Sequence, residues 1–173
     1  MTQLRYPDIF FDWGDTVMYD EPANPAPMVA WAEVRMVPGI DQVLAYLQAS
    51  GRRISLATSA SISNEAEIRA ALARVNLDMY FERIFCFQNT GRLKSETFYR
   101  YILQQLQIQP SEALMVGDSL EKDVLTANRL GLRAVWFNPR TDEEHADDLA
   151  ITVHNLQDLV TFFVHLDKEN ENE

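Results

Sequence analysis

The chain has 173 residues, of which 47% are hydrophobic and 24% are charged, values typical of an ordinary globular domain. Its formal net charge of −11 argues against unspecific binding to nucleic acid phosphates, and no apolar run reaches the roughly 20 residues that cross a bilayer. The first residues lack the basic region and apolar core of a secretory signal. Cys86 is the only cysteine, so no intramolecular disulfide forms, and the expected compartment is the cytoplasm.

Short apolar runs alternate with helical patterns along the chain, which indicates βαβ units and a parallel sheet. The expected strands are, in chain order, Ile9–Asp12, Ile54–Thr58, Ile84–Phe87, Ala113–Val116, Ala134–Phe137 and Ile151–Val153. Apolar residues at helical spacing predict helices over residues 40–47 and 98–106. Asn64 and Glu67 form a capping pair for a further helix. The predicted fold is a doubly wound, mainly parallel α/β sheet with helices on both faces.

The Pro-rich segment Tyr19–Pro27 predicts a loop over the active edge of this sheet. Open parallel sheets bind ligands at the carboxyl ends of their strands. Polar residues gather there: Asp12 ends the first strand, Thr58 ends the second, and the fourth leads to Asp118. Lys94 follows the third strand. We therefore expect these four side chains to meet in one crevice.

The segments FFDWGDTV, ISLATS, GRLKSETF and MVGDSLEKD carry these residues, and in order and spacing they resemble the four signatures of the haloacid dehalogenase-like (HAD) superfamily. The resemblance covers about residues 8–140. It implies a Rossmann-like core and an Mg²⁺-dependent, phosphatase-like hydrolase. Such an enzyme attacks a phosphate monoester through an aspartyl-phosphate intermediate.

The resemblance also implies a metal site. Its ligands for Mg²⁺ would be a carboxylate oxygen of Asp12, the backbone carbonyl of Gly14, and Asp118. Asp123 would be a direct or water-mediated ligand, or would orient Lys94. Carboxylate and carbonyl oxygens are the donors that Mg²⁺ prefers.

By the same resemblance Asp12 is the nucleophile, and Lys94 neutralises both that carboxylate and the phosphate. Thr58 donates a hydrogen bond to the transferring phosphoryl group. Trp13 and Ser59, which follow Asp12 and Thr58, complete the expected substrate-binding set.

The first signature departs from the family pattern. Phosphatases of this family read Asp-x-Asp-Gly-Thr, and their second Asp protonates the leaving oxygen and then activates water. Gly14 stands at that position, and loss of such an acid costs a rate factor of ~10² to 10⁴. Asp15 is a candidate replacement if the turn is rewound by one residue. The alternative is a low-turnover or non-catalytic module that binds metal and phosphate.

The segments between the signatures are too short for a substantial cap domain, which argues against the family's dehalogenases and phosphonate-cleaving enzymes. An open site suits a phosphorylated small molecule or macromolecule, or is closed by a second subunit of a homo-oligomer. A receiver-like phosphoacceptor domain also places Asp, Thr and Lys at strand ends, but its acidic pair lies near the first strand. The expected organisation is one HAD-like domain over residues 1–166 and a flexible acidic tail over residues 167–173.

Overall fold

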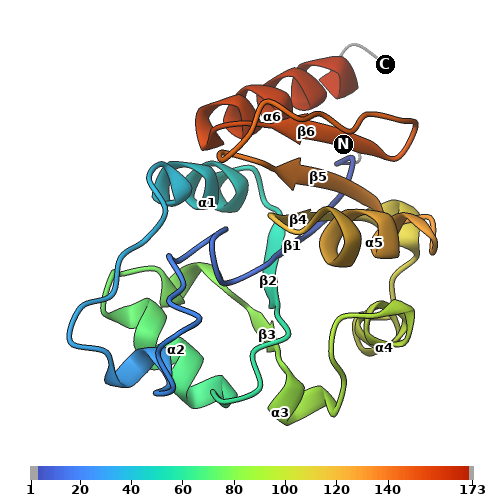
Figure 1. The fold of residues 1–173 in the computed structure, drawn as a ribbon. Coiled ribbons are helices and arrows are strands. Elements are labelled where there is room, and N and C mark those ends of the chain that lie inside the picture. The colour runs from blue at the N-terminus through green and yellow to red at the C-terminus, as the bar shows by residue number, and fades with distance from the viewer. Residues whose placement is uncertain (1–3, 172–173) are drawn as a thin grey trace.

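The computed structural model describes residues 4–171, with side chains up to residue 169. Within that range six strands form one sheet in the order β3-β2-β1-β4-β5-β6, and each pairing is parallel (Figure 1). The strands are β1 (Asp8–Phe11), β2 (Arg53–Ala57), β3 (Arg83–Phe85), β4 (Ala113–Gly117), β5 (Arg133–Phe137) and β6 (Ala150–Val153). The chain moves outward from β1 to β3 and then returns to β4, beside β1. This reversal makes β1 and β4 the switch point of a doubly wound sheet, as predicted.

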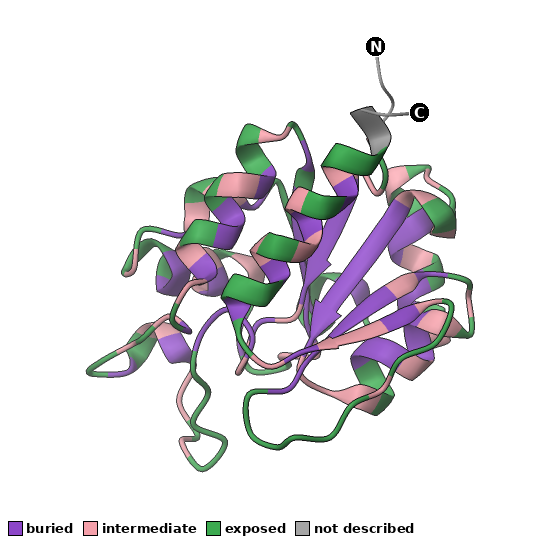
Figure 2. Cartoon of the chain, turned by 90° about the horizontal axis from the view of Figure 1, so that it is seen from above, coloured by how far each residue is buried: buried purple, intermediate pink, exposed green. Residues whose placement is uncertain are grey.

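Helices cover both faces of the sheet. The longer ones are α1 (Ile40–Ala49), α2 (Glu65–Ala73), α4 (Glu96–Leu106) and α6 (Leu156–Glu171), and the short ones are α3 (Phe87–Thr90) and α5 (Thr126–Asn128). Residues of α1, α2 and α6 share a buried cluster with Ile9 and Phe11, whereas α4 and α5 share another with Phe10. Side chains alternate between the faces of a strand, so β1 feeds both cores. Figure 2 shows the buried strands enclosed by helices whose outer turns are exposed.

Local sequence explains where two of the helices begin. The predicted pair at the start of α2 is present: the Asn64 side chain accepts from the Glu67 amide, and the Glu67 carboxylate accepts from the Asn64 amide. At α4, the Ser95 hydroxyl accepts from the Phe98 amide. Both caps satisfy amides that a helix leaves without a partner in its first turn.

The segment between β1 and α1 contains no inserted domain. Tyr19–Pro27 has no regular element, as predicted, and a single 3₁₀ turn, η1 (Met28–Ala30), follows it. The Trp31 indole donates to the Ala26 carbonyl at 2.8 Å. Arg74, just after α2, donates to the Val29, Trp31 and Ala32 carbonyls at 3.2, 2.7 and 3.0 Å. These bonds attach the segment to the helical layer.

The strand predicted to end at Phe87 is shorter. β3 ends at Phe85, Cys86 precedes α3, and Phe87 is the first residue of that helix. The Asn89 side chain turns the chain there: it accepts from the Cys86 amide at 3.0 Å and donates to the Ile84 carbonyl at 2.7 Å. Local side-chain bonding of this kind competes with strand pairing.

The chain predicted to be a flexible tail from residue 167 continues α6 as far as Glu171. Asp167 binds Arg52, whose side chain has no exposed surface, with Nη2 of the arginine 2.5 Å from Oδ1. A buried guanidinium is costly without a carboxylate partner, so the pairing with Asp167 stabilises the last turns of α6. None of the helices in the described range combines the length and apolar character that crossing a membrane requires.

Candidate active site at the carboxyl ends of β1, β2 and β4

A cleft of about 460 Å³ opens at the carboxyl ends of the central strands. Its lining includes every residue that the sequence predicted for the site: Asp12, Trp13, Gly14, Asp15, Thr58, Ser59, Lys94, Asp118 and Asp123. Asp12, Thr58 and Asp118 each directly follow a strand. The neighbouring positions of β1, β2 and β4 therefore bring together residues that lie far apart in the sequence.

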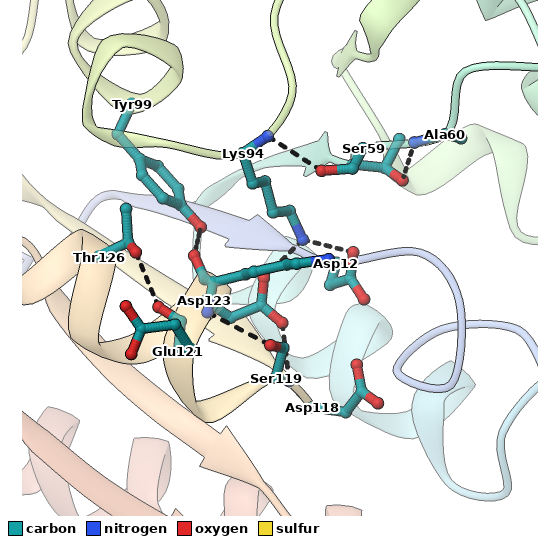
Figure 3. A network of polar contacts seen from close by, with 12 residues as sticks. Asp12, Ser59, Ala60, Lys94, Tyr99, Asp118, Ser119, Glu121, Asp123 and Thr126 are labelled. Carbon is teal, nitrogen blue, oxygen red and sulfur yellow. Dashed lines mark hydrogen bonds and ion pairs between the residues drawn. The ribbon is translucent and has the colours of Figure 1, made fainter.

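Lys94 joins two carboxylates in the floor of the cleft (Figure 3). Its ammonium donates to Oδ1 of Asp12 and, at 2.5 Å, to Oδ1 of Asp123. The lysine side chain is only 3% exposed. Its backbone amide donates to the Ser59 hydroxyl at 2.9 Å, so the second residue after β2 holds the loop that carries the lysine. Ser59 thus contributes to the site by fixing Lys94.

Burial controls the protonation of this cluster. It raises the pKa of Asp12, and the nearby Asp118 adds to that rise against the opposing effect of Lys94. Burial likewise raises the pKa of Asp123 to about 6, again against Lys94. Burial alone would lower the pKa of Lys94, but Asp12 and Asp123 reverse the direction and raise it. The lysine is therefore an ammonium ion that only partly neutralises the carboxylates around it.

Asp12, Asp118 and Asp123 each offer an oxygen, and these oxygens lie within 4.8 Å of one another. Such a set of hard oxygen donors fits Mg²⁺. The charge balance agrees, since three acidic side chains face one buried ammonium, that of Lys94, and one largely exposed guanidinium, that of Arg140. Gly14 lines the same cleft and has a backbone carbonyl to add.

Gly117, the last residue of β4, allows Asp123 to reach the cluster. A Cβ at this position would lie 2.2 Å from Oδ2 of Asp123, far inside contact distance. Asp123 is 1% exposed, and the same Oδ2 accepts from the Ser119 amide at 3.0 Å. It belongs to a π-helical turn, η4 (Leu120–Leu125). Only a glycine leaves room for this carboxylate against the end of the strand.

Thr58 and Trp13 occupy less exposed parts of the lining. The Thr58 hydroxyl oxygen accepts from the Ala60 amide at 3.1 Å, which leaves its hydrogen available for donation. The Trp13 side chain is buried, and its indole N–H has no hydrogen-bond partner among the described residues. Thr58 is therefore well placed to donate to an anion, and Trp13 contributes mainly apolar surface.

Asp15 has a left-handed backbone, with φ of 58°. Its Oδ1 accepts from the Asp20 amide at 3.1 Å, and its Oδ2 lies 3.6 Å from Nη1 of Arg140. Both oxygens of the carboxylate that was predicted as a replacement acid are thus engaged by the surrounding chain.

The sequence did not single out Arg140 and Asp20, which also lie at this edge of the sheet. Arg140 follows β5 and donates to Oδ2 of Asp118 at 2.5 Å, so applying the strand-end rule to β5 would have found it. Asp20 lies in the predicted loop and lines the cleft. A Cβ built on Gly14 would lie 3.2 Å from both Cβ and Oδ2 of Asp20. Partial burial raises the pKa of Asp20, and Asp15 and Glu21 add to that rise.

Known proteins similar to this chain include several phosphatases. Its sequence is 31% identical over 142 residues to the ribulose-1,5-bisphosphate 5-phosphatase of Halopiger xanaduensis, covering 75% of this chain and 58% of that protein. It is 31% identical over 108 residues to the glyceraldehyde 3-phosphate phosphatase of Pyrococcus abyssi, covering 62% of this chain and 44% of that protein. The chain thus spans about half the length of these curated relatives.

Solved structures agree on the fold. An uncharacterized protein from Listeria monocytogenes serotype 4b has a TM-score of 0.80 at 25% identity, covering 93% of this chain and 98% of that one. A HAD phosphatase from Thermococcus onnurineus has a TM-score of 0.62 at 26% identity, covering 75% and 58%. The family model described as haloacid dehalogenase-like hydrolase matches residues 26–137, a segment that includes Thr58, Lys94, Asp118 and Asp123 and begins after Asp12. The chain therefore belongs to the haloacid dehalogenase-like hydrolase family.

Proposed function

We propose that the protein is an Mg²⁺-dependent phosphatase that attacks a phosphate monoester with the carboxylate of Asp12. The observation that carries this proposal is the meeting of Asp12, Lys94, Asp118 and Asp123 in one cleft at the switch point of the sheet. A carboxylate at a rigid strand end attacks phosphorus effectively only when it is held in position and the phosphoryl charge is screened. The cluster has the groups for both tasks.

The proposed metal ligands are Asp12, the carbonyl of Gly14, and Asp118, with Asp123 as a further or water-mediated ligand. When bound, Mg²⁺ supplies positive charge for the phosphoryl oxygens. Asp123 also accepts from the Lys94 ammonium, so orienting that lysine is its second proposed role.

The chain's own residues divide the remaining work. Asp12 attacks phosphorus and forms an aspartyl-phosphate, while Lys94 neutralises the attacking carboxylate and the phosphoryl group. Thr58 donates to a phosphoryl oxygen, Ser59 holds the loop of Lys94, and Trp13 forms part of the wall beside the substrate. Within the first signature, Asp15 is the remaining candidate for protonating the leaving group.

The substrate class follows from the relatives and from the open cleft. Ribulose-1,5-bisphosphate 5-phosphatase and glyceraldehyde 3-phosphate phosphatases are among the relatives, so we propose a phosphorylated small molecule as substrate. A phosphorylated macromolecule is the alternative that the absence of an inserted cap leaves open. We infer that the protein acts in the cytoplasm, because its one cysteine, Cys86, is a buried free thiol. A homo-oligomer that closes the site stays a prediction.

Hydrolysis of p-nitrophenyl phosphate tests the assignment. We expect turnover in Mg²⁺, none in EDTA, and a loss of at least 10²-fold in Asp12→Asn. Asp41→Asn, in the first turn of α1 and outside the cleft, is a control that keeps full rate. A panel containing ribulose 1,5-bisphosphate and glyceraldehyde 3-phosphate then ranks substrates. Activity that survives Asp12→Asn would refute the mechanism.

A second function is favoured by one observation, the glycine at position 14. A protein without a side chain there would bind Mg²⁺ and phosphate and turn over little. No turnover across a broad phosphate panel, combined with Mg²⁺-dependent binding of fluoroberyllate, would support this module and replace the phosphatase assignment.

A further inference from the structure

We propose that Asp20 is the general acid and base of this site and occupies the space that Gly14 leaves free. The inference rests on the proposed phosphatase function. It assigns the proton transfers to a residue of the loop rather than to the turn that directly follows Asp12.

The geometry at Gly14 carries the inference. A side chain at position 14 would begin 3.2 Å from Cβ and Oδ2 of Asp20, so the Asp20 carboxyl lies in the direction in which such a side chain would extend. Gly14, Asp20 and the nucleophile Asp12 all line the same cleft. Asp20 is eight positions after Asp12 in the sequence, but its carboxyl group lies where a side chain at position 14 would lie.

The carboxylates of the Lys94 cluster and of the turn after Asp12 have partners that occupy them. Asp12 and Asp123 accept from Lys94, and Asp118 accepts from Arg140. Asp15 is bonded to the Asp20 amide and lies near Arg140. Oδ2 of Asp20, in contrast, has no hydrogen bond or ion pair with any residue of the described chain. An acid that must exchange a proton with substrate and water needs such a free oxygen.

The local backbone holds Asp20 in this position. Its Oδ1 accepts from the Glu21 amide at 2.8 Å, which holds the carboxyl group and leaves Oδ2 beside Gly14. Its own amide donates to Oδ1 of Asp15 at 3.1 Å, and the preceding Tyr19 amide donates to the Arg35 carbonyl at 2.9 Å. Asp15 is thereby a positioning residue for Asp20.

The two proton transfers balance over one cycle. In the first step a carboxylate oxygen of Asp12 bonds to phosphorus, the bond from phosphorus to the leaving oxygen breaks, and the Asp20 proton passes to that oxygen to release an alcohol. In the second step the Asp20 carboxylate takes a proton from water as the water oxygen bonds to phosphorus. The bond between phosphorus and Asp12 breaks, and inorganic phosphate leaves. Asp20 is then protonated again.

Rapid-mixing kinetics of Asp20→Asn with p-nitrophenyl phosphate and Mg²⁺ test the role. Nitrophenolate needs no proton to leave, so we expect a burst of about one equivalent per enzyme, followed by turnover slowed about 10²- to 10⁴-fold because water is no longer activated. The alcohol released from an alkyl phosphate must be protonated as it leaves. With this substrate Asp20→Asn should therefore slow the first step itself, and no burst should appear. Glu33→Gln, which makes the same change of charge at an exposed residue outside the cleft, should retain wild-type behaviour.

The outcomes separate this inference from the proposed function. Wild-type turnover that depends on Asp12, together with an Asp20→Asn variant within threefold of wild type on both substrates, overturns the role of Asp20 and leaves the phosphatase assignment intact. The same holds if Asp15→Asn gives the burst and Asp20→Asn does not. Absence of wild-type turnover overturns both. Circular dichroism of each variant confirms that the loss is not one of folding.

Discussion

Replacing Asp167 by Asn removes the one carboxylate, among the described residues, that pairs with the buried guanidinium of Arg52. That guanidinium is bonded on all sides: Nε donates to the Tyr6 carbonyl, Nη1 to the Ser50 hydroxyl and Asp167, and Nη2 to the Arg5 carbonyl and Asp167. The Asp167→Asn variant keeps the shape of the side chain and loses its negative charge. Arg52 then remains buried and uncompensated.

Removing one partner of a buried pair costs about 3–5 kcal/mol, and we take the lower end, about 3 kcal/mol, because the Asp167 side chain is 21% exposed. For a chain of this size that corresponds to a fall in melting temperature of about 6–12 °C. Urea unfolding followed by circular dichroism measures the free energy directly. Glu169→Gln is the matched control, since Glu169 pairs with Arg5 at 3.5 Å on an exposed surface and should cost little.

The pH dependence gives an independent check. Partial burial raises the pKa of Asp167, but hydrogen bonds from Arg52 and Tyr46 outweigh it and hold the pKa below its ordinary value. A carboxyl whose pKa is lowered by folding stabilises the protein above the unfolded pKa of about 3.9, and this stability is lost as the pH falls through the folded value. The difference between wild type and Asp167→Asn should therefore shrink below about pH 4. A difference under 0.5 kcal/mol at neutral pH, or one that does not change with acid, would refute the reasoning.

Four further outcomes follow from the site. Lys94→Met should lower turnover at least 10²-fold and lower the free energy of unfolding measured in urea by about 3 kcal/mol, since two buried carboxylates lose their cation; a fully active variant would contradict the cluster. Gly117→Ala should cost about 1–3 kcal/mol in the same assay, because its Cβ would overlap the Asp123 side chain, and wild-type stability would disprove that contact. Gly14→Asp should not raise turnover by itself but should recover about tenfold in an Asp20→Gly background, and no recovery there counts against the spatial replacement. EDTA should abolish turnover and excess Mg²⁺ should restore it, with activity in chelator as the contrary result.

Much of the fold and most of the cleft follow from patterns that act over short distances. Four buried residues lead directly to Asp12, and a buried run likewise precedes Thr58 and Asp118. In a parallel sheet the residues that follow neighbouring strands meet at one edge, so their convergence needed only the strand assignments. The correct capping pair at Asn64 has the same local origin.

The features that escaped prediction depend on contacts between distant or conformationally unusual residues. Asp167 binds an arginine 115 positions away, so composition alone indicated a frayed tail. Asp20 reaches Gly14 because Asp15 adopts a left-handed backbone and the chain folds back at Met18, which bridges to Gly14. Few non-glycine residues adopt that conformation, and although Asp does so more often than most, the motif alone does not determine it.

Arg74 and Trp31 make the rim of the cleft rigid, and this rigidity affects ligand binding. Their bonds to the carbonyls of residues 26–32 fasten the wall of the opening to the helical layer in advance. A ligand meeting a mouth of fixed shape spends little conformational entropy on ordering it. Substitution of Arg74, remote from any chemistry, should therefore weaken Michaelis binding more than it slows the reaction itself.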